Sequence, residues 1–123
     1  MLNNEQRLDL LTSALEGGSN YWYFIGLDAS RKIRLMWGGD KNDPFVNKMW
    51  NALETGESIE IHDIEDPEGD PLGSISLKSI EEGEQIMHDK YPGHYADVLN
   101  ECGDADTGDV WFQLAIMKDI VYG

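Results

Sequence analysis

The stretch that decides the fold is residues 106–123, which read DTGDVWFQLAIMKDIVYG. It is apolar on almost every side, in a chain of 123 residues whose formal net charge is -15. A helix that is apolar all round is normally buried inside a protein. We therefore expect this stretch to form the centre of the hydrophobic core, with the rest of the chain arranged around it.

Length and composition predict a single domain spanning residues 1–123. A chain of this size buries enough surface to fold without a metal or a disulfide, and its one cysteine, Cys102, allows no internal disulfide. No run approaches the ~20 apolar residues of a membrane span, and the polar first residues do not resemble a secretory signal. We expect a cytoplasmic protein that binds no membrane.

The charge is strongly acidic, with 24 Asp and Glu against 9 Lys and Arg. Residues 54–70 hold eight acids and no base, whereas Arg31, Lys32 and Arg34 form the only basic cluster. Binding to nucleic acid requires clustered cations that neutralise phosphates. The composition therefore predicts no direct binding to DNA or RNA.

Apolar periodicity and turn signals together predict an α+β fold. We expect helices at about residues 3–16, 43–55, 79–91, 95–102 and from 106 onward, and strands at 21–27, 32–37, 58–63 and 72–77. The first two strands would pair as a hairpin, and glycines and acids at 38–43 would then break the chain. The result is an antiparallel sheet of about four strands, packed by N-terminal, central and C-terminal helices.

Two helices carry more detailed expectations. On the first helix, Leu11 and Leu15 share the face that should pack on the core, while Arg7 should point outward. On the helix after the last strand, Ser79 and Glu82 have the spacing of a capping box, in which each side chain binds the other residue's backbone N–H. These patterns set the expected orientation of the first helix and the expected start of the second.

Residues 14–22, ALEGGSNYW, resemble the start of a family of small uncharacterised proteins encoded by bacteriophages and prophages. Members carry a Glu-Gly-Gly-x-x-Tyr-Trp element after a first helix and end in an apolar helix with Val-Tyr-Gly or Val-Phe-Gly, as residues 120–123, IVYG, do here. Many relatives have a glycine before the last apolar triplet, whereas this chain has MKD at 117–119. The resemblance implies a phage protein acting as an accessory factor in the host cytoplasm, and it implies no particular chemistry.

The best candidate for a binding site is the predicted hairpin. Tyr21 and Tyr23 would share one side of the first strand, and Arg31, Arg34 and Trp37 would add cations and a second aromatic wall. Aromatic rings stack nucleobases, and arginine binds phosphate. The alternative interpretation is that the aromatic residues extend the core and the basic residues form a solvated sheet edge.

Other catalytic and metal patterns are missing from the sequence. The acids at 63–70 and 104–109 lack the spacing of a calcium loop, and the histidines lack zinc-ligand spacing. The glycines at 17–18 follow a helix, whose C-terminal end repels phosphate. Cys102 is expected on a buried helix face as an inert thiol. We expect no metal and no cofactor.

Three function hypotheses follow from these observations. The first is a non-enzymatic phage accessory protein that binds a host defence or regulatory component, for example by sequestering a small anionic nucleotide, with a homo-oligomer as a further expectation. The second is an acidic protein–protein inhibitor whose residues 54–70 mimic the charge of DNA. The third is a small enzyme that uses His62 with neighbouring carboxylates as acid–base groups.

Overall fold

The computed structural model describes residues 2–37 and 42–123, which form one small domain that mixes α-helices with an antiparallel sheet. The helices are α1 (Asn4–Ser13), a π-helical turn η1 (Ala14–Gly18), α2 (Leu27–Trp37), α3 (Phe45–Glu54), α4 (Leu77–Lys90), α5 (Pro92–Leu99) and α6 (Ala105–Met117). The strands are β1 (Tyr23–Phe24), β2 (Ile59–Asp63) and β3 (Gly73–Ile75), in the order β1-β2-β3. The predicted α+β class is confirmed.

In the described part of the chain, none of the helices combines the length and the apolar character that crossing a bilayer demands.

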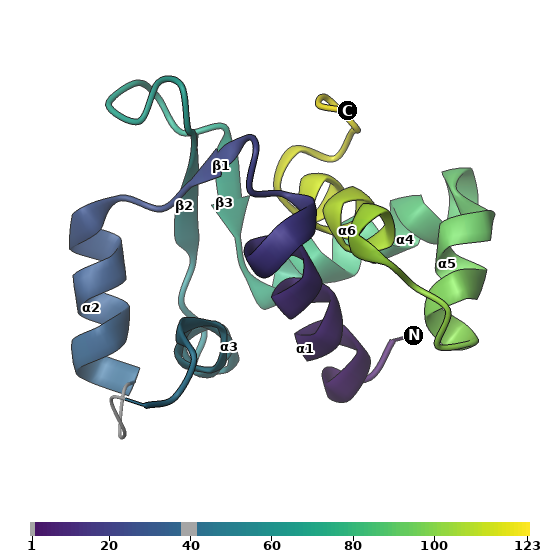
Figure 1. Ribbon diagram of the computed structural model, residues 1–123, viewed down its shortest axis with the longest axis horizontal. Coiled ribbons are helices and arrows are strands. Elements are labelled where there is room, and N and C mark those ends of the chain that lie inside the picture. The colour runs from purple at the N-terminus through teal and green to yellow at the C-terminus, as the bar shows by residue number, and fades with distance from the viewer. Residues whose placement is uncertain (1, 38–41) are drawn as a thin grey trace.

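Helix α6 lies at the centre of the molecule, between α4 and α5 on one side and α1, η1 and β3 on the other (Figure 1). Trp111, Phe112 and Leu114 are at most 1% exposed, so the expected burial of this stretch is confirmed for α6. The helix ends sooner than expected, because Lys118 adopts a left-handed backbone with φ 62°. Residues 118–123 leave it as an extended tail in which Val121 is exposed.

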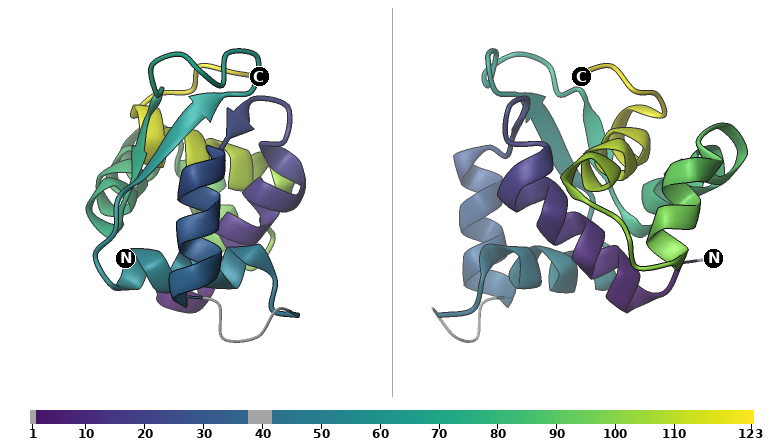
Figure 2. Two further views of the ribbon diagram at one scale, coloured as in Figure 1. Left: turned by 90° about the vertical axis from the view of Figure 1, so that its left-hand side faces the viewer. Right: turned by 45° about the vertical axis from the view of Figure 1, so that its right-hand side comes forward.

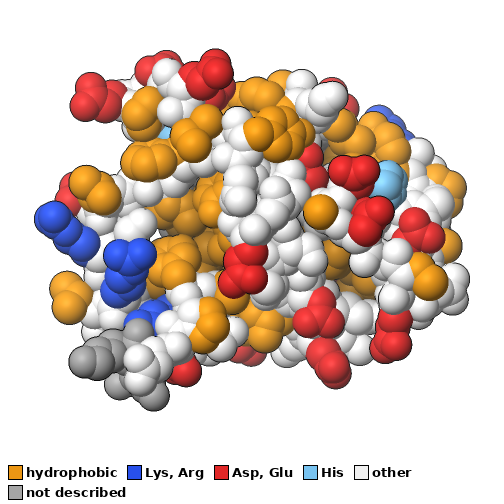
Figure 3. Space-filling model, viewed as in Figure 1, with side chains coloured by type: hydrophobic (Ala, Val, Ile, Leu, Met, Phe, Trp, Pro, Cys, Tyr) orange, Lys and Arg blue, Asp and Glu red, His pale blue; other side chains and the backbone are white. Residues whose placement is uncertain are grey.

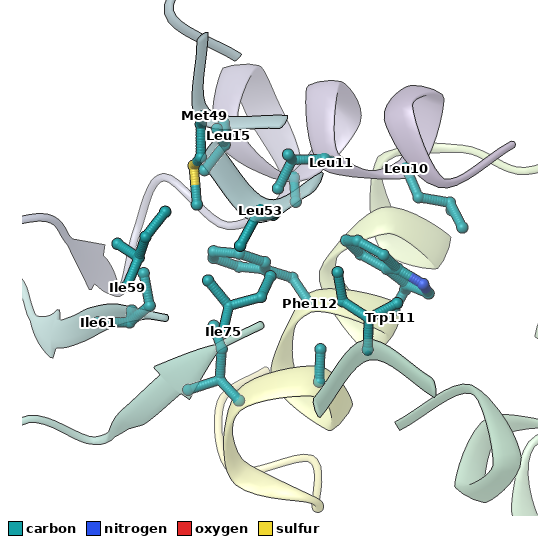
Figure 4. Packing of buried hydrophobic residues seen from close by; sticks show 14 of the residues in the cluster. Leu10, Leu11, Leu15, Met49, Leu53, Ile59, Ile61, Ile75, Trp111 and Phe112 are labelled. Carbon is teal, nitrogen blue, oxygen red and sulfur yellow. The ribbon is translucent and has the colours of Figure 1, made fainter. Parts of the chain in front are cut away.

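The hydrophobic core surrounds the ring of Phe112. Side chains from α1, η1, α3 and the sheet converge on this ring (Figure 4). Along β2 the side chains alternate as predicted, since Ile59 and Ile61 are buried while Glu60 is exposed. Full burial of one such aliphatic side chain contributes roughly 1.5–3 kcal/mol to folding, so this cluster is the main source of stability.

Helices α4 and α6 approach so closely that no side chain fits between them at Gly83. A Cβ atom added there would lie 2.6 Å from the backbone nitrogen of Ala115. Real Cβ atoms essentially never show so short a contact. Gly83 therefore sets the separation of these two helices.

The predicted hairpin is wrong, because residues 27–37 form helix α2 instead of a turn and a second strand. β1 pairs with β2, with Tyr23 opposite Asp63, so the described sheet has three strands and not the expected four. Ile33 is buried and Ala29, one turn earlier, is half-buried, which is helical and not strand periodicity. Figure 2 shows α2 at the outer edge of the molecule, beside α3. Of the break expected at 38–43, residues 38–41 lie outside the described residues.

Helix α5 begins at Pro92 and not near residue 95, and the starts of α4 and α6 also differ from the expected ones. Ser76, and not Ser79, is the N-cap of α4, and a hydrogen bond of 2.8 Å from the Ser76 backbone N–H to Ser79 Oγ completes the capping box without Glu82. Leu77, expected at the end of a strand, is therefore the first helical residue. Helix α6 begins earlier than expected, with the side chain of Asp104 as its cap. In both cases the cap is a short polar side chain three residues before the bonded N–H.

Arg7 is buried and does not point outward as expected. Its Nε and Nη2 atoms donate to the carboxylate of Glu84 on α4, at 2.9 and 2.7 Å from the nearest oxygens. Trp111 Nε1 donates to the same carboxylate at 3.0 Å. The hydrogen bond to Glu84 raises the pKa of Arg7 above its ordinary value. Helices α1, α4 and α6 are therefore joined by one buried polar cluster.

Candidate functional site

The Glu-Gly-Gly-x-x-Tyr-Trp element joins the end of η1 to helix α6. Ser19 Oγ and Trp22 Nε1 both donate to Asp109 Oδ1, at 2.7 and 2.8 Å, and the Tyr21 hydroxyl donates to Asp109 Oδ2 at 2.7 Å. Gly18 lies against the carbonyl of Ala105 on α6, where a larger residue would collide. A buried carboxylate is stabilised when each oxygen accepts hydrogen bonds. The element is therefore accounted for by packing and hydrogen bonding.

The C-terminal tail packs against the same element. The rings of Trp22 and Tyr122 are stacked, with centroids 5.2 Å apart and an interplanar angle of 10°. The Tyr122 hydroxyl donates to Asp63 Oδ2 at 2.7 Å, and Gln113 Oε1 accepts from the backbone N–H groups of residues 121 and 122. The two segments that carry the sequence resemblance thus contact each other.

The structure brings together two of the five predicted binding residues. Tyr23 and Arg34 line one hollow, although Arg34 comes from a helix and not from a paired strand. Tyr21 faces Asp109 instead, and burial of its hydroxyl end together with that hydrogen bond raises its pKa to about 12. Arg31 is exposed and does not line the hollow, and the side chain of Trp37 lies outside the described part of the structure.

We call this hollow, between α2, β1 and the start of α3, the aromatic hollow. It encloses about 330 Å³, at the small end of the roughly 300–1,000 Å³ typical of small-molecule sites. Its lining consists of Asn20, Tyr23, Phe24, Ile25, Ser30, Arg34, Phe45 and Ile64. Three aromatic side chains, two aliphatic ones and three hydrogen-bonding ones therefore face the same space.

Arg34 and Phe45 form one wall of the aromatic hollow. The guanidinium carbon of Arg34 lies 5.3 Å from the centroid of the Phe45 ring, which is the geometry of a cation–π pair. The ring holds the cation beside the hollow, while the N–H groups of Arg34 form no hydrogen bond or ion pair with the described residues. Arg34 therefore has donors available for a ligand.

Tyr23 is held rigidly at the other side of the hollow. Its hydroxyl donates to the Leu15 carbonyl at 3.0 Å, and its ring meets Phe112 edge to face, with centroids 5.6 Å apart. Burial raises the pKa of Tyr23, so the side chain stays neutral at physiological pH. Tyr23 consequently offers a ring surface to the hollow and not a charge.

The aromatic hollow differs in charge from the rest of the surface. Arg34 is the only charged residue in its lining, whereas each of three other hollows includes carboxylates. Figure 3 shows Lys and Arg side chains over α2 beside a recess with a hydrophobic floor, and Asp and Glu side chains on other parts of that face. In a chain of net charge -15, the lining of this hollow therefore carries one positive charge and no negative charge.

His62 lines a second, larger hollow of about 660 Å³. Its Nδ1 lies 3.1 Å from the Gly69 carbonyl and its Nε2 lies 3.7 Å from Glu60 Oε2. The carbonyl contact favours the tautomer with hydrogen on Nδ1. The other lining residues are apolar or acidic and supply no hydroxyl, thiol or amine nucleophile. The hypothesis of an enzyme based on His62 stays a prediction.

Cys102 is exposed, which corrects the expectation of a buried thiol. Helix α5 ends at Leu99, before it would carry Cys102 onto a helix face, and Cys102 Sγ donates to the Asn100 carbonyl at 3.3 Å. Within residues 2–37 and 42–123, no group of three or more His, Cys, Asp or Glu side chains is arranged to hold a metal ion.

Sequence reasoning missed four residues that matter for the site and its support: Phe24, Phe45, Ile64 and Asp109. The sequence contained a signal for Phe45 as a site residue. An aromatic residue directly after a helix-starting proline lies at the exposed end of the apolar stripe of that helix. Asp109 gave a signal as an acid inside an apolar helix, since such a group must be paired when buried.

Comparisons with protein-family models, curated proteins and solved structures find no match for this chain.

Proposed function

We propose that this protein is a phage-encoded accessory protein that sequesters a small anionic nucleotide of the host cell, acting against a host defence or regulatory component. The observation that carries the proposal is the aromatic hollow, where the Arg34 guanidinium lies 5.3 Å from the Phe45 ring in a lining without carboxylates. Aromatic surface beside an arginine is the combination that binds a base and a phosphate together.

The residues of the hollow divide into two roles. Phe24, Tyr23 and Phe45 supply ring surfaces on which a nucleobase stacks, a contact worth about 1–3 kcal/mol per base. Arg34 supplies a bidentate donor for a phosphate, and the Ser30 hydroxyl beside it is a further hydrogen-bonding group. The lining contains no Asp, Glu, His, Cys or Lys that could act as a general base or activate the Ser30 hydroxyl, so binding without chemical conversion fits this site best.

Electrostatics favours a ligand with a single phosphate. The protein carries a net charge of -15, so a polyphosphate or an oligonucleotide is repelled by the surrounding surface. Charges farther than about 8 Å are largely screened at physiological salt, which leaves Arg34 as the dominant charge for a phosphate in contact with it. A nucleoside monophosphate, linear or cyclic, therefore fits the hollow better than a longer species.

Isothermal titration calorimetry with nucleoside monophosphates, their cyclic forms and ribose 5-phosphate tests the proposal. Arg34→Met should weaken binding by about 10- to 100-fold, because a charge-assisted hydrogen bond contributes about 1.5–3 kcal/mol. Arg31→Met is the matched control, since it removes the same charge from the same helix outside the hollow. No heat and no thermal shift with any of these nucleotides would contradict the proposal.

A second candidate function is direct inhibition of a basic host protein through the acidic loop between β2 and β3. Glu65, Glu68 and Asp70 are exposed there. The loop is ordered by hydrogen bonds from the Glu65 backbone N–H to Asp63 Oδ1, at 2.8 Å, and between His62 and the Gly69 carbonyl. An ordered array of carboxylates can present a fixed charge pattern to a partner.

A pulldown from host lysate tests whether the acidic loop binds a basic host protein. The triple variant Glu65→Gln, Glu68→Gln and Asp70→Asn should release a nucleic-acid-binding protein that the unaltered chain retains at low salt. Glu16→Gln, Glu81→Gln and Asp97→Asn remove the same number of exposed carboxylates outside residues 54–70 and serve as control. Retention of the same partner by both triple variants would argue against the loop as the binding surface.

A further inference from the structure

The outer face of helix α2, defined here as Leu27, Arg31 and Leu35, is exposed along its length, and Leu27 at its first residue also borders the hollow that contains His62. The three residues are four apart and so form one stripe along the helix. Leu27 is 67% exposed and Leu35 is 84% exposed, and Arg31 between them forms no hydrogen bond or ion pair with the described residues. Two leucines flanking a cation in water are typical of a protein contact surface.

The same chain carries a groove of complementary character. The acidic groove, of about 420 Å³, lies between α1 and the connection from α5 to α6. Its lining is Asn3, Glu5, Gln6, Asp9, Leu10, Ser13, Val98, Glu101, Gly103 and Asp104. It therefore contains four carboxylates, no Lys or Arg, and two buried aliphatic side chains, Leu10 and Val98.

We propose that copies of this chain associate head to tail, with the outer face of α2 of one copy docked in the acidic groove of the next. In this contact Arg31 faces Asp9 and Glu101, which have no ion pair within the described residues, while Leu35 covers the aliphatic floor. Charge complementarity favours the α2 face of a second copy as the occupant of the groove. The groove is lined by carboxylates, and an acidic face of a second copy would bring no cation to them. The proposal does not depend on the nucleotide site, since Arg34 and not Arg31 lines the aromatic hollow.

The placement of the two surfaces determines the kind of assembly. Helix α2 lies at one end of the long axis of the molecule, away from α1 and from the connection between α5 and α6 (Figure 1), which supply the residues that line the groove. Two different surfaces that meet form a heterologous contact, which yields rings or open chains and not a two-fold dimer. At 0.15 M salt the Debye length is about 8 Å, so the contact between opposite charges persists while the repulsion between whole copies is reduced.

Analytical ultracentrifugation at this salt concentration tests the proposal with two variants. The face variant, Arg31→Gln with Leu35→Gln, keeps its groove, and the groove variant, Asp9→Lys with Glu101→Lys, keeps its α2 face. The unaltered chain should form species larger than a dimer as its concentration rises into the high micromolar range. Each variant alone should sediment as a monomer, and an equimolar mixture should form a heterodimer and nothing larger.

Three outcomes would each overturn the proposal. The unaltered chain could stay monomeric, the face variant could still assemble, or the two monomeric variants could fail to pair on mixing. Lys78→Glu reverses an exposed charge on α4 without touching either surface and should assemble like the unaltered chain. Circular dichroism and thermal melting verify that each variant is folded. The face variant should still bind a nucleotide, so failure of assembly and failure of the nucleotide site are distinguishable.

Discussion

Trp22 and Asp109 are joined by a hydrogen bond of 2.8 Å from the indole Nε1 to the carboxylate Oδ1, across 87 positions of the chain. Both residues are buried, and the same carboxylate also accepts from Ser19 and Tyr21. The bond fixes the segment that leads into β1 against the first turns of α6. Because β1 contributes Tyr23 to the aromatic hollow, the position of that hollow depends on this buried carboxylate.

Asp109→Asn should lower the free energy of unfolding by about 1–3 kcal/mol, because the amide NH₂ cannot accept the hydrogen bonds that one carboxylate oxygen accepts. Urea denaturation followed by tryptophan fluorescence measures the change. Asp106→Asn, an exposed acid one turn earlier on α6, is the control and should cost less than about 1 kcal/mol. Equal losses for the two variants would show that the hydrogen-bond cluster is not stabilising.

Stability should fall at alkaline pH because of Tyr21 and Tyr122. Burial of each hydroxyl and its bond to a carboxylate raise both pKa values from 10.0 to about 12, so folding favours the neutral phenol. Their contribution is fully present below pH 10 and is lost as the pH rises from 10 toward 12. Denaturation at a series of pH values should show this slope, and Tyr21→Phe with Tyr122→Phe should flatten it. An unchanged slope in the double variant would refute the assignment.

Gly83→Ala should destabilise the protein by more than about 2 kcal/mol, although alanine normally favours a helix over glycine by about 1 kcal/mol. The added methyl group collides with the backbone of α6 near Ala115, and one helix must move. Gly93→Ala in α5 is the matched control, because no atom lies within 4 Å of its added Cβ. It should leave the melting temperature unchanged or raise it. A stabilised Gly83→Ala variant would mean that α4 and α6 are not packed this closely.

Glu84→Gln should cost about 3–5 kcal/mol, because it leaves the buried Arg7 guanidinium without its counter-charge. The glutamine carbonyl can still accept from Trp111, so the loss reports mainly on Arg7. Adding Arg7→Met to Glu84→Gln removes the unpaired cation and should recover part of the stability. A double-mutant cycle by chemical denaturation measures the coupling, and additive losses would indicate that the two charges do not interact.

Phe45→Leu should weaken nucleotide binding by about 5- to 150-fold, the equivalent of about 1–3 kcal/mol of stacking. The leucine also removes the ring that holds the Arg34 guanidinium beside the hollow. Ribose 5-phosphate, which has no base, should lose much less affinity than a nucleotide when both are titrated by calorimetry. The same loss for both ligands would place the base away from Phe45.

The apolar helix α6, helix α3 and strand β2 were predictable because a single residue pattern dominates each of them. Helix α2 was not, because residues 32–35 alternate polar and apolar side chains and are followed by two more apolar residues, a pattern that also suits a strand. A strand also needs a partner, and β2 is already paired by β1 and β3. Asp28, expected in a turn, instead occupies the first turn of α2, where an acid suits the helix dipole.

The candidate site was predictable only in part. Tyr23 and Arg34 were expected on paired strands, and they meet because α2 packs beside β1 and α3. Phe45 could not be assigned to the site, since it comes from a third element whose position depends on tertiary packing. Arg7 and Glu84 were equally inaccessible to pattern analysis, because the two residues are 77 positions apart and their burial as an ion pair depends on how α1 packs against α4.

The central helix α6 follows in the chain every element that it packs against. During translation, the ribosome therefore exposes α1, the sheet, α4 and α5 before the residues that fill the space between them have been made. The apolar faces around Phe112 have no partner until residues 105–117 leave the exit tunnel. The core of this domain consequently cannot close before residues 105–117 have been made, and a nascent chain arrested before residue 105 should remain accessible to chaperones and proteases.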